Sequence, residues 1–417
     1  MNHRAYPSTL PTTTDVAIIG AGPSGAIAAA LLRQRGHRVI ILEKQHFPRF
    51  SIGESLLPHC MEFIEQAGMT AAVEQAGFQF KNGATFARNG HTTSFDFTQK
   101  FTSGPGTTYQ VQRAGFDQLL AREAEKAGAE ILFGHAIEGI EFNNNRVQLQ
   151  VTAEGSDPYS LDAGFVLDAS GFGRVLPRLL NLEQPSGFPV RTSLFTHIEN
   201  GISDPEYDRN KILITINPGN REIWYWLIPF ADGRCSVGVV AEQRYIGEVP
   251  GSPLEQLRSL IDDAPDLGNL IENALYTSPV QQITGYSRNV TRLWGEGYAL
   301  LGNAGEFLDP VFSSGVTIAM RSAGMAAPLV SRQLRGESVD WEKEYAIPLK
   351  KGVDTFRTFV DAWYDGSFQD VIFAPNQHDD VRRMICSILA GYAWDTDNPY
   401  VANPRRRLKT LVELCRS

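Results

Sequence analysis

The sequence predicts an α/β fold in which a parallel sheet with flanking helices joins a second, antiparallel sheet and a C-terminal helical region. Three observations support this prediction. An apolar strand, a glycine-rich turn, a helix and a second strand follow one another in DVAIIGAGPSGAIAAALLRQRGHRVIILEK, near the N-terminus. Short apolar runs separated by turn sequences fill the middle of the chain, and apolar residues at helical spacing fill its end. At 417 residues the chain exceeds the roughly 250–300 residues of one core, so two lobes sharing an interface are expected.

Composition and charge narrow the range of partners. The net charge of −9 and the pI of about 5.5 give no general attraction to nucleic acid or anionic lipid. The apolar run near the N-terminus is interrupted by glycines and a proline and lacks a signal-peptide charge layout, so we expect a cytoplasmic protein without a membrane span. The cysteines lie far apart, with no CxxC and no paired histidine, which indicates buried thiols and neither a disulfide framework nor a metal site: Cys60, Cys235, Cys386 and Cys415.

The first strand, turn and helix form a Rossmann-like pattern. A strand at Val16–Ile19 leads into glycines in GxGxxG spacing, a helix at Ala26–Arg35, and a second strand at Val39–Leu42 that ends at Glu43. The glycines allow a tight turn and close approach to a pyrophosphate, the helix N-terminus favours phosphate, and a carboxylate about 20 residues later can accept from a ribose hydroxyl. A purely structural glycine turn does not require this order of elements. We therefore predict a dinucleotide site at Gly20, Gly22, Pro23, Ser24, Gly25, Glu43 and Lys44.

Two later segments repeat the strand and turn pattern. VLDASGFGRVLPRLL (166–180) is an apolar strand with a small-residue turn, and GYALLGNAGEFLDPVFSSGVTIAMRSAG (297–324) is a strand, a loop with Asp309, and a helix that starts near Ser314. This pattern resembles the glutathione-reductase-like FAD fold up to about residue 335, which implies a bound FAD, Asp309 as a hydrogen-bond partner of the ribityl chain, and further FAD contacts at Asp168 and Gly302. Only one GxGxxG is present, so a separate flavin reductase is expected to supply FADH2, unless a nicotinamide binds transiently.

The remaining chain divides into a sheet and a helical region. We assign residues 1–182 and 286–337 to the FAD-binding domain, with 80–110 contributing to the substrate lobe, 183–285 to the sheet of that lobe, and 338–417 to the helical region. The aromatic residues of the helical region are expected mostly in the core, with some open to a substrate cleft: Phe356, Phe359, Trp363, Tyr364 and Phe368. The basic run PRRRLK (404–409) is either a solvated tail or a contact for an acidic carrier protein.

Five segments resemble a narrower family. FPRFSIGESLLPHCMEFIEQAG (47–68), FKNGATF (80–86), YQVQRAGFDQLLAREAEKAGAEI (109–131), WYWLIP (224–229) and DPVFSSGV (309–316) are similar to signature segments of the flavin-dependent halogenases, especially those acting on phenolic, pyrrolic or carrier-bound substrates. The resemblance implies an FADH2-dependent enzyme of secondary metabolism, such as antibiotic biosynthesis. Such an enzyme converts chloride or bromide and O2 to hypohalous acid and halogenates an electron-rich aromatic, either free or on an acyl or peptidyl carrier protein.

The resemblance also implies roles for particular residues. Lys81 would direct the oxidised halogen, which requires either a neutral amine or an ammonium that donates a hydrogen bond to it. Small residues at a helix start would hold the halide, at Ser314 and Gly315, with Ser313 between flavin and lysine. The bulky WxWxIP side chains would keep an organic substrate away from the flavin. The shielding residues are Trp224, Trp226 and Pro229, with Ile228 completing the motif, and further flavin contacts are expected at Arg49, Gly53, Glu54, Ser55, Arg113, Gly315 and Val316.

Each of these assignments has a simpler alternative. Lys81 is otherwise a solvated residue at a strand end, and WYWLIP a strand with alternate residues facing one core. The serines of SSG are candidates for a helix N-cap, which is compatible with anion binding. Asp117 is equally a surface cap for the helix that follows Arg113. No histidine near these segments has an evident acid–base partner in the sequence, and His59 is expected to be a helix residue.

Departures from the family pattern bear on the reaction. Asn303 stands where many FAD enzymes of this fold have aspartate, and Phe312 where the tryptophan-directed halogenases have glutamate, which disfavours free tryptophan as substrate. The turn DASGFGRVLPR carries a Phe-Gly insertion. Such variants also occur in halogenase-like oxidoreductases that do not halogenate, so a flavin monooxygenase or reductase is the alternative. A flavin-binding regulator without catalysis would leave the reaction-side motifs unexplained.

Overall fold

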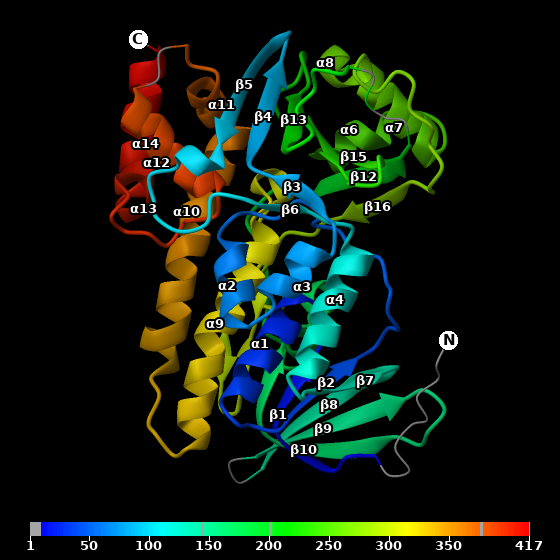
Figure 1. Cartoon of the computed structure of the whole chain (residues 1–417), viewed down its shortest axis with the longest axis vertical. Coiled ribbons are helices and arrows are strands. Elements are labelled where there is room, and N and C mark those ends of the chain that lie inside the picture. Colours follow the sequence, from blue (N-terminus) through cyan, green and yellow to red (C-terminus); the bar gives the residue numbers. More distant parts are fainter. Residues whose placement is uncertain (1–9, 144–145, 200–201, 203, 376–377, 417) are drawn as a thin grey trace.

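A computed structural model describes residues 10–143, 146–199, 202, 204–375 and 378–416. The chain forms two lobes (Figure 1). The lower lobe in that view contains a parallel sheet with its helices, and the upper lobe contains a second sheet with the C-terminal helices beside it. The α/β fold with two sheets is therefore confirmed. Among the described residues, no helix is both long and apolar enough to span a bilayer.

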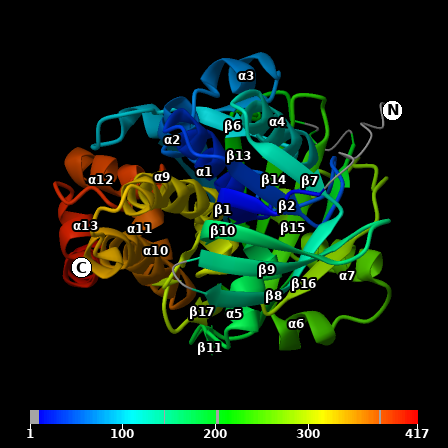
Figure 2. The ribbon, with the colours of Figure 1, turned by 90° about the horizontal axis from the view of Figure 1, so that it is seen from below.

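The first sheet is built around the parallel strands β10, β1, β2 and β7. β19 extends it parallel to β10, and β8 and β9 join β10 as an antiparallel meander. Seen from below, α1 and α4 lie on one side of the parallel strands and β8 and β9 on the other (Figure 2). The strands are β1 (Thr13–Ile19), β2 (Val39–Glu43), β7 (Glu130–Phe133), β8 (His135–Asn143), β9 (Arg146–Ala153), β10 (Tyr159–Asp168), β18 (Trp294–Gly295) and β19 (Tyr298–Leu300).

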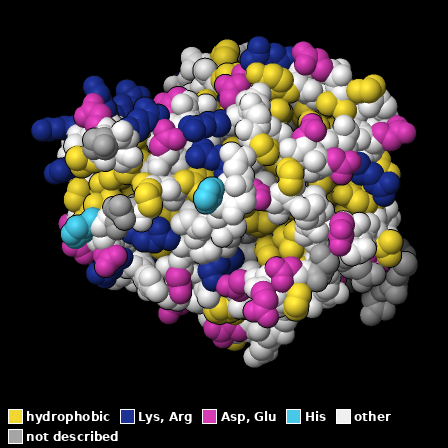
Figure 3. Space-filling view, turned by 90° about the horizontal axis from the view of Figure 1, so that it is seen from above, with side chains coloured by type: hydrophobic (Ala, Val, Ile, Leu, Met, Phe, Trp, Pro, Cys, Tyr) yellow, Lys and Arg dark blue, Asp and Glu magenta, His cyan; other side chains and the backbone are white. Residues whose placement is uncertain are grey.

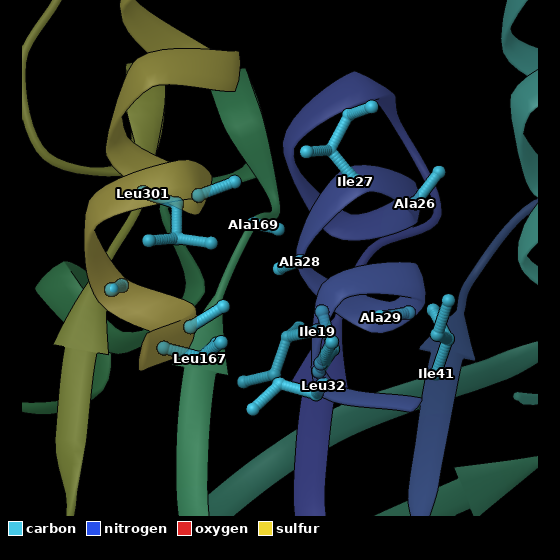
Figure 4. Close-up of a cluster of buried hydrophobic side chains, with 14 of the residues drawn as sticks. Ile19, Ala26, Ile27, Ala28, Ala29, Leu32, Ile41, Leu167, Ala169 and Leu301 are labelled. Atoms are coloured by element: carbon cyan, nitrogen blue, oxygen red, sulfur yellow. The ribbon is translucent and has the colours of Figure 1, made fainter. Parts of the chain in front are cut away.

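The glycine-rich turn has the geometry that the sequence predicts. Gly20 has φ +97°, a left-handed backbone that favours glycine. A Cβ at Gly25 would lie 2.0 Å from the Gly20 carbonyl oxygen, so no other residue allows this approach of helix to strand. Figure 4 shows Ile19 and Ile41 of two neighbouring strands beside α1, with Leu167 of the next strand toward the ribbon that carries Leu301. The helices of this lobe are α1 (Pro23–Gln34), α2 (Cys60–Gln66), α3 (Thr70–Gln75), α4 (Arg113–Lys126), α5 (Val175–Leu179) and α9 (Ser314–Leu334).

The second sheet has seven strands in the order β16-β12-β15-β14-β13-β4-β5. All its pairs are antiparallel except β13 with β4, where residues from the N-terminal third join the sheet. Helices α6 (Gln243–Gly247), α7 (Pro253–Asp262) and α8 (Pro265–Gly268) follow its strands. The strands are β4 (Gly83–Arg88), β5 (His91–Asp96), β12 (Arg191–Ile198), β13 (Lys211–Ile216), β14 (Trp224–Pro229), β15 (Cys235–Glu242) and β16 (Gln281–Thr284), and two separate ribbons are β3 (Gln79–Lys81) with β6 (Thr108–Gln110) and β11 (Glu183–Pro185) with β17 (Arg288–Val290).

The last part of the chain is helical and packs on one face of the second sheet (Figure 1). A π-helical turn at Glu342–Ala346 leads into α10 (Ile347–Tyr364), α11 (Ser367–Ile372), α12 (Asp379–Leu389), α13 (Pro399–Ala402) and α14 (Pro404–Arg416). The aromatic residues expected in the core are buried, apart from the half-buried Tyr364.

The basic run at residues 404–409 is not a solvated tail. It begins α14, which buries Leu408, Leu411 and Val412 against the other helices. The apolar residues recur at helical spacing, so one face of the helix packs while the arginines at 405–407 stay exposed. Figure 3 shows Lys and Arg side chains gathered on the side of the molecule where the C-terminal helices lie.

The four cysteines are free thiols. Cys60, Cys235 and Cys386 are buried and Cys415 is half-buried, so the interpretation as buried thiols is correct for three of them.

Candidate active site

A cavity of about 800 Å³ lies between the two sheets. One end is at the carboxyl ends of β1 and β2, where Ile19 and Glu43 line it, and the other reaches Trp224 and Trp226 of β14. β1 lies between β2 and β10 in the sheet, so the strands that follow β1 in the chain are placed on both sides of it. Open α/β sheets bind ligands at such a crevice at the carboxyl ends of their strands.

Most residues predicted from the sequence line this one cavity, although they come from six distant segments. They are Gly20, Gly22, Pro23, Ser24, Glu43, Lys44, Arg49, Gly53, Glu54, Ser55, Arg113, Trp224, Trp226, Ser313, Gly315 and Val316. The remaining predicted residues do not line it, and they are Gly25, Lys81, Asp168, Pro229, Gly302, Asp309 and Ser314.

The end of the cavity at α1 suits a pyrophosphate. Gly22 is the N-cap residue of α1 and Pro23 its first residue, so the unpaired N–H groups of the first turn are at the cavity wall. Glu43 Oε2 accepts a hydrogen bond from the Ala21 N–H at 2.9 Å, which fixes the carboxylate at the end of β2. The contact of Glu43 with a ribose hydroxyl stays a prediction.

Two arginines on the cavity wall share one buried carboxylate. Asp117 is fully buried and accepts from Arg113 Nε at 2.7 Å and from Arg49 Nη1 at 3.2 Å. The alternative of a surface helix cap for Asp117 is therefore wrong. The pair Arg113 and Asp117 is four residues apart on α4, and Arg113 also donates to the Ile52 carbonyl at 2.6 Å, so it anchors the segment that carries Gly53 and Glu54.

Three buried polar atoms on the cavity wall have no protein partner within the described residues. They are Arg49 Nε, Glu54 Oε2 and Asn303 Oδ1. Buried polar groups in folded proteins are nearly always hydrogen-bonded, so one donor and two acceptors are available to a polar ligand. FAD offers both phosphate acceptors and ring and hydroxyl donors, and the residues of this cavity therefore fit it. Asn303 supplies an acceptor where related enzymes have aspartate.

Sequence reasoning missed a carboxylate and imidazole pair. His197 Nε2 lies 2.7 Å from Glu54 Oε1, and the imidazole ring packs against Phe50 and Phe230. The expectation that no histidine near the signature segments has an acid–base partner did not cover His197, which β12 brings to a residue 143 positions earlier in the chain. A second such contact joins His59 Nε2 and Glu62 Oε2 at 3.5 Å, and His59 lies just before α2, where a helix residue was expected.

Lys81 is fully buried behind the cavity wall. Its Nζ donates to Ser55 Oγ at 2.7 Å and to the Leu56 carbonyl at 2.7 Å, and it lies 5.4 Å from the centre of the Phe97 ring. Burial lowers its pKa to about 7. The alternative of a solvated lysine is therefore wrong. Lys81 does not line the cavity itself, but Ser55 does, so one side chain separates the amine from the cavity.

The segment WYWLIP forms a strand with alternating faces, and its tryptophans also line the cavity, so its two interpretations are compatible. Trp224, Trp226 and Ile228 belong to one core and line the cavity, while the alternate residues Tyr225 and Leu227 belong to the core on the other face. The indole N–H groups donate to Tyr364 Oη and Ser236 Oγ, which fixes both rings. Pro229 ends the strand outside the cavity. The shielding role stays a prediction.

The turn before α9 is strained at a serine. Ser313 has φ +54°, in the left-handed region, and lines the cavity together with Gly315. The side chain of Ser313 forms no cap hydrogen bond, so the N-cap interpretation is not observed for it. Ser314 begins α9 and is buried outside the cavity. Gly315 lies in the first turn of α9 and lines the cavity, and its role in holding a halide stays a prediction.

Asp309 is engaged by protein groups. Its Oδ1 accepts from the Val311 N–H at 3.1 Å and its Oδ2 from Tyr364 Oη at 2.9 Å, and burial raises its pKa to about 6. Tyr364 in turn accepts from Trp224, so a hydrogen-bonded chain joins the loop before α9 to the tryptophan wall, which is the part of the cavity wall formed by Trp224 and Trp226. The contact with a ribityl chain stays a prediction.

Two other predicted residues support the cavity from behind. Asp168 accepts from the Ser170 and Leu176 N–H groups at 2.9 and 2.7 Å, which fixes the turn after β10. A Cβ at Gly302 would lie 2.7 Å from Ala319, so this glycine allows α9 to pack closely. The sequence did not reveal the wall at residues 135–138, because no motif marks it, and it marked the segment of Phe172 and Arg178 without assigning either residue to the site.

Comparison with known proteins agrees with this geometry. Residues 13–251 match the family model of the FAD binding domain, which is more than half of the chain. A tryptophan 2-halogenase of Chondromyces crocatus is 32% identical over 79% of this chain and 63% of its own length. A 1H-pyrrole-2-carbonyl-[peptidyl-carrier protein] brominase of Pseudoalteromonas luteoviolacea is 28% identical over 79% of this chain and 80% of its own length.

A solved structure is similar over nearly all of the chain. The flavoprotein/dehydrogenase of Cytophaga hutchinsonii is 41% identical, with a TM-score of 0.93, over 97% of this chain and 99% of that one. The chain spans less than two thirds of the length of the tryptophan 2-halogenase. The match to the family model, the halogenase relatives and the cavity together show that the chain is an FAD-binding protein and belongs to the flavin-dependent halogenase family.

Proposed function

We propose that the protein is an FADH2-dependent halogenase that uses Lys81 to direct an oxidised halogen to an electron-rich aromatic substrate. The observation that carries this proposal is the fully buried Lys81 amine, which is held by Ser55 of the cavity wall and has a pKa of about 7. Bound FADH2 supplies the two electrons that activate O2. Overall, halide, O2, FADH2 and a proton give hypohalous acid, FAD and water.

The buried amine suits this role in either protonation state. Near pH 7 about half of the Lys81 side chains are neutral, because burial lowers the pKa to about 7. A neutral amine can take the halogen from hypohalous acid, which releases water, and an ammonium can donate a hydrogen bond to it. Both routes pass Ser55, since this residue stands between the amine and the cavity.

The proposed substrate is a phenol or a pyrrole, either free or on a carrier protein. A relative that acts on a pyrrole held by a peptidyl carrier protein supports the carrier-bound form. The exposed arginines at 405–407 on α14 are the proposed contact for an acidic carrier protein. Phe312, which is buried where tryptophan-directed enzymes have glutamate, argues against free tryptophan, whereas the relative from Chondromyces crocatus is named for that substrate. We also propose a separate flavin reductase as the source of FADH2, and chloride or bromide as the halide.

A flavin monooxygenase or reductase without halogenation is the second candidate. Its support is the flavoprotein/dehydrogenase of Cytophaga hutchinsonii, which is 41% identical to this chain, whereas the two halogenase relatives described above are 32% and 28% identical. Such an enzyme would oxidise or reduce its substrate without halide.

The two candidates differ in their dependence on bromide and on Lys81. Purified protein is supplied with FADH2, O2, bromide and a phenolic probe, and the products are compared for the wild type, Lys81→Ala and the control Lys409→Ala, which changes an exposed lysine. The proposal predicts brominated phenol from the wild type and the control, none from Lys81→Ala, and FAD bound by all three. An unhalogenated product that is independent of bromide and Lys81 would favour the second candidate.

A further inference from the structure

A second cavity of about 500 Å³ lies apart from the flavin cavity and shares no lining residue with it. It forms where four segments meet: the start of α2, the chain after β5, the middle of α9 and the turn after α12. The first two of these segments also enclose Lys81, through the Leu56 carbonyl and the Phe97 ring. A ligand here would therefore lie against the segments that hold the buried amine.

The aromatic walls of this second cavity are fixed in place by the backbone. His59 Nδ1 lies 3.0 Å from the Gly391 carbonyl oxygen, and its ring stacks on Tyr392 with centroids 4.6 Å apart. Tyr392 Oη donates to the Pro105 carbonyl at 2.9 Å, and Trp394 Nε1 donates to the Pro348 carbonyl at 3.1 Å. The rings are therefore in position before a ligand binds, which reduces the entropy cost of binding.

One cation on the wall has a buried nitrogen without a hydrogen-bond partner in the described part of the chain. Arg321 lies on α9 with its guanidinium 5.6 Å from the Trp394 ring centre and 5.9 Å from that of Phe63. Glu62 attracts it through its charge, but its buried Nε has no hydrogen-bond partner among the residues that the structure describes. The N–H groups of a guanidinium can bind a carboxylate in bidentate form.

The carboxylates of the cavity differ in their partners. Glu62 is already occupied, because its hydrogen bond to His59 lowers its pKa and holds it ionised. Asp395 and Asp397 line the same cavity and form no ion pair with any residue in the described ranges. A ligand that is only an anion would be repelled by these carboxylates, and one that is only a cation by Arg321.

We infer that this second cavity binds a small aromatic zwitterion, such as an aromatic α-amino acid, with its carboxylate on Arg321 and its ammonium near Asp395 and Asp397. The aromatic ring of the ligand would pack against Tyr392 and Trp394. This assignment concerns binding alone and holds whether or not the bound molecule is halogenated.

The test uses the FAD-loaded protein and isothermal titration calorimetry with three probes of the same ring. L-phenylalanine carries both charges, 3-phenylpropionate only the carboxylate, and 2-phenylethylamine only the ammonium. We expect L-phenylalanine to bind about tenfold or more tightly than either analogue, because it alone satisfies both charged groups. Equal affinity of all three probes, or no binding of L-phenylalanine, would overturn the inference.

Matched variants locate the binding. Arg321→Gln should weaken the binding of L-phenylalanine about tenfold, so that it binds no more tightly than 2-phenylethylamine. The double change Asp395→Asn with Asp397→Asn should make L-phenylalanine bind no more tightly than 3-phenylpropionate. Arg335→Gln, which changes an exposed arginine just after the same helix, should leave all affinities unchanged. Normal FAD content and circular dichroism establish that the variants fold. L-phenylalanine binding that is insensitive to Arg321→Gln would contradict the assignment.

Discussion

The Nζ atom of Lys81 lies 2.7 Å from Ser55 Oγ, and Ser55 is the residue that separates this amine from the flavin cavity. The contact places a titratable group without solvent exposure directly behind the wall of a cofactor site. The other two contacts of the amine, the Leu56 carbonyl and the Phe97 ring, come from residues that do not line this cavity. The proposed reaction therefore depends on this pair.

Ser55→Ala tests the pair directly. The change removes one of the two hydrogen bonds that stabilise the ammonium, so we expect halogenated product per FADH2 consumed to fall about tenfold while FAD stays bound. Product and FAD content are measured together by liquid chromatography. The control is Ser51→Ala, which also lies on the cavity wall but has no contact with Lys81. An equal loss in both variants would show a general disturbance of the wall instead.

The buried amine should make stability depend on pH. The pKa of Lys81 is about 7 in the folded protein and 10.5 in an exposed lysine, so between these values the unfolded chain binds one more proton. The free energy of unfolding contributed by Lys81 then rises with pH through this window, by up to about 1.4 kcal/mol per pH unit, and is constant below pH 7.

Urea unfolding of the wild type and of Lys81→Met at pH 6.5, 8 and 9 measures this dependence. Methionine has a similar length and no charge. We expect the difference in the free energy of unfolding, wild type minus variant, to increase as pH rises from 7 to 9. A constant difference across these pH values would show that Lys81 keeps its proton in the folded protein.

The pair Glu54 and His197 should act as one unit. The two side chains are 2.7 Å apart and Glu54 lines the cavity, so Glu54→Gln and His197→Asn should each weaken FAD binding. The double variant should bind FAD no more weakly than the single variant with the larger loss. We expect a coupling energy of about 1–2 kcal/mol from FAD affinities in a double-mutant cycle. Additive effects would mean that the two residues act separately.

Gly238 should be needed for the position of Trp226. A Cβ at Gly238 would lie 2.4 Å from the indole ring, so Gly238→Ala must displace the ring or the strand. We expect a loss of about 1–3 kcal/mol in the free energy of unfolding, and altered quenching of tryptophan fluorescence by bound FAD. The control is Gly247→Ala, where an added Cβ meets nothing within 4 Å. Equal unfolding free energies and equal quenching in the two variants would show that close packing at Gly238 does not position Trp226.

The sequence predicts the backbone geometry of the glycine-rich turn and the strand that follows α1 well, because local chemistry determines them. Gly20 needs a left-handed backbone, Gly25 needs contact without a side chain, and Glu43 ends a strand that the pattern itself marks. The two faces of β14 were also predictable from alternation, since Trp224 and Trp226 share a face and Tyr225 does not.

Contacts between distant segments could not be predicted in the same way. The partner of Glu54 lies 143 residues away, and the Ser55 contact of Lys81 depends on how the ribbon of β3 and β6 packs on the segment before α2. Neither contact leaves a periodic signal. The sequence left the surface cap open for Asp117 for a related reason, because one of the two arginines that donate to this buried carboxylate comes from a segment 68 residues away.

Transfer of the halogen through Lys81 is tested most directly by a single turnover of the FADH2-loaded protein with O2, bromide and a phenol. Brominated phenol and free hypobromous acid are measured in the same reaction, the acid with a chemical trap. We predict that the wild type gives brominated phenol with little free acid, and that Lys81→Ala gives free acid at a similar yield with no brominated phenol. Brominated phenol from Lys81→Ala in wild-type yield, or no bromide oxidation by the wild type, would contradict this account.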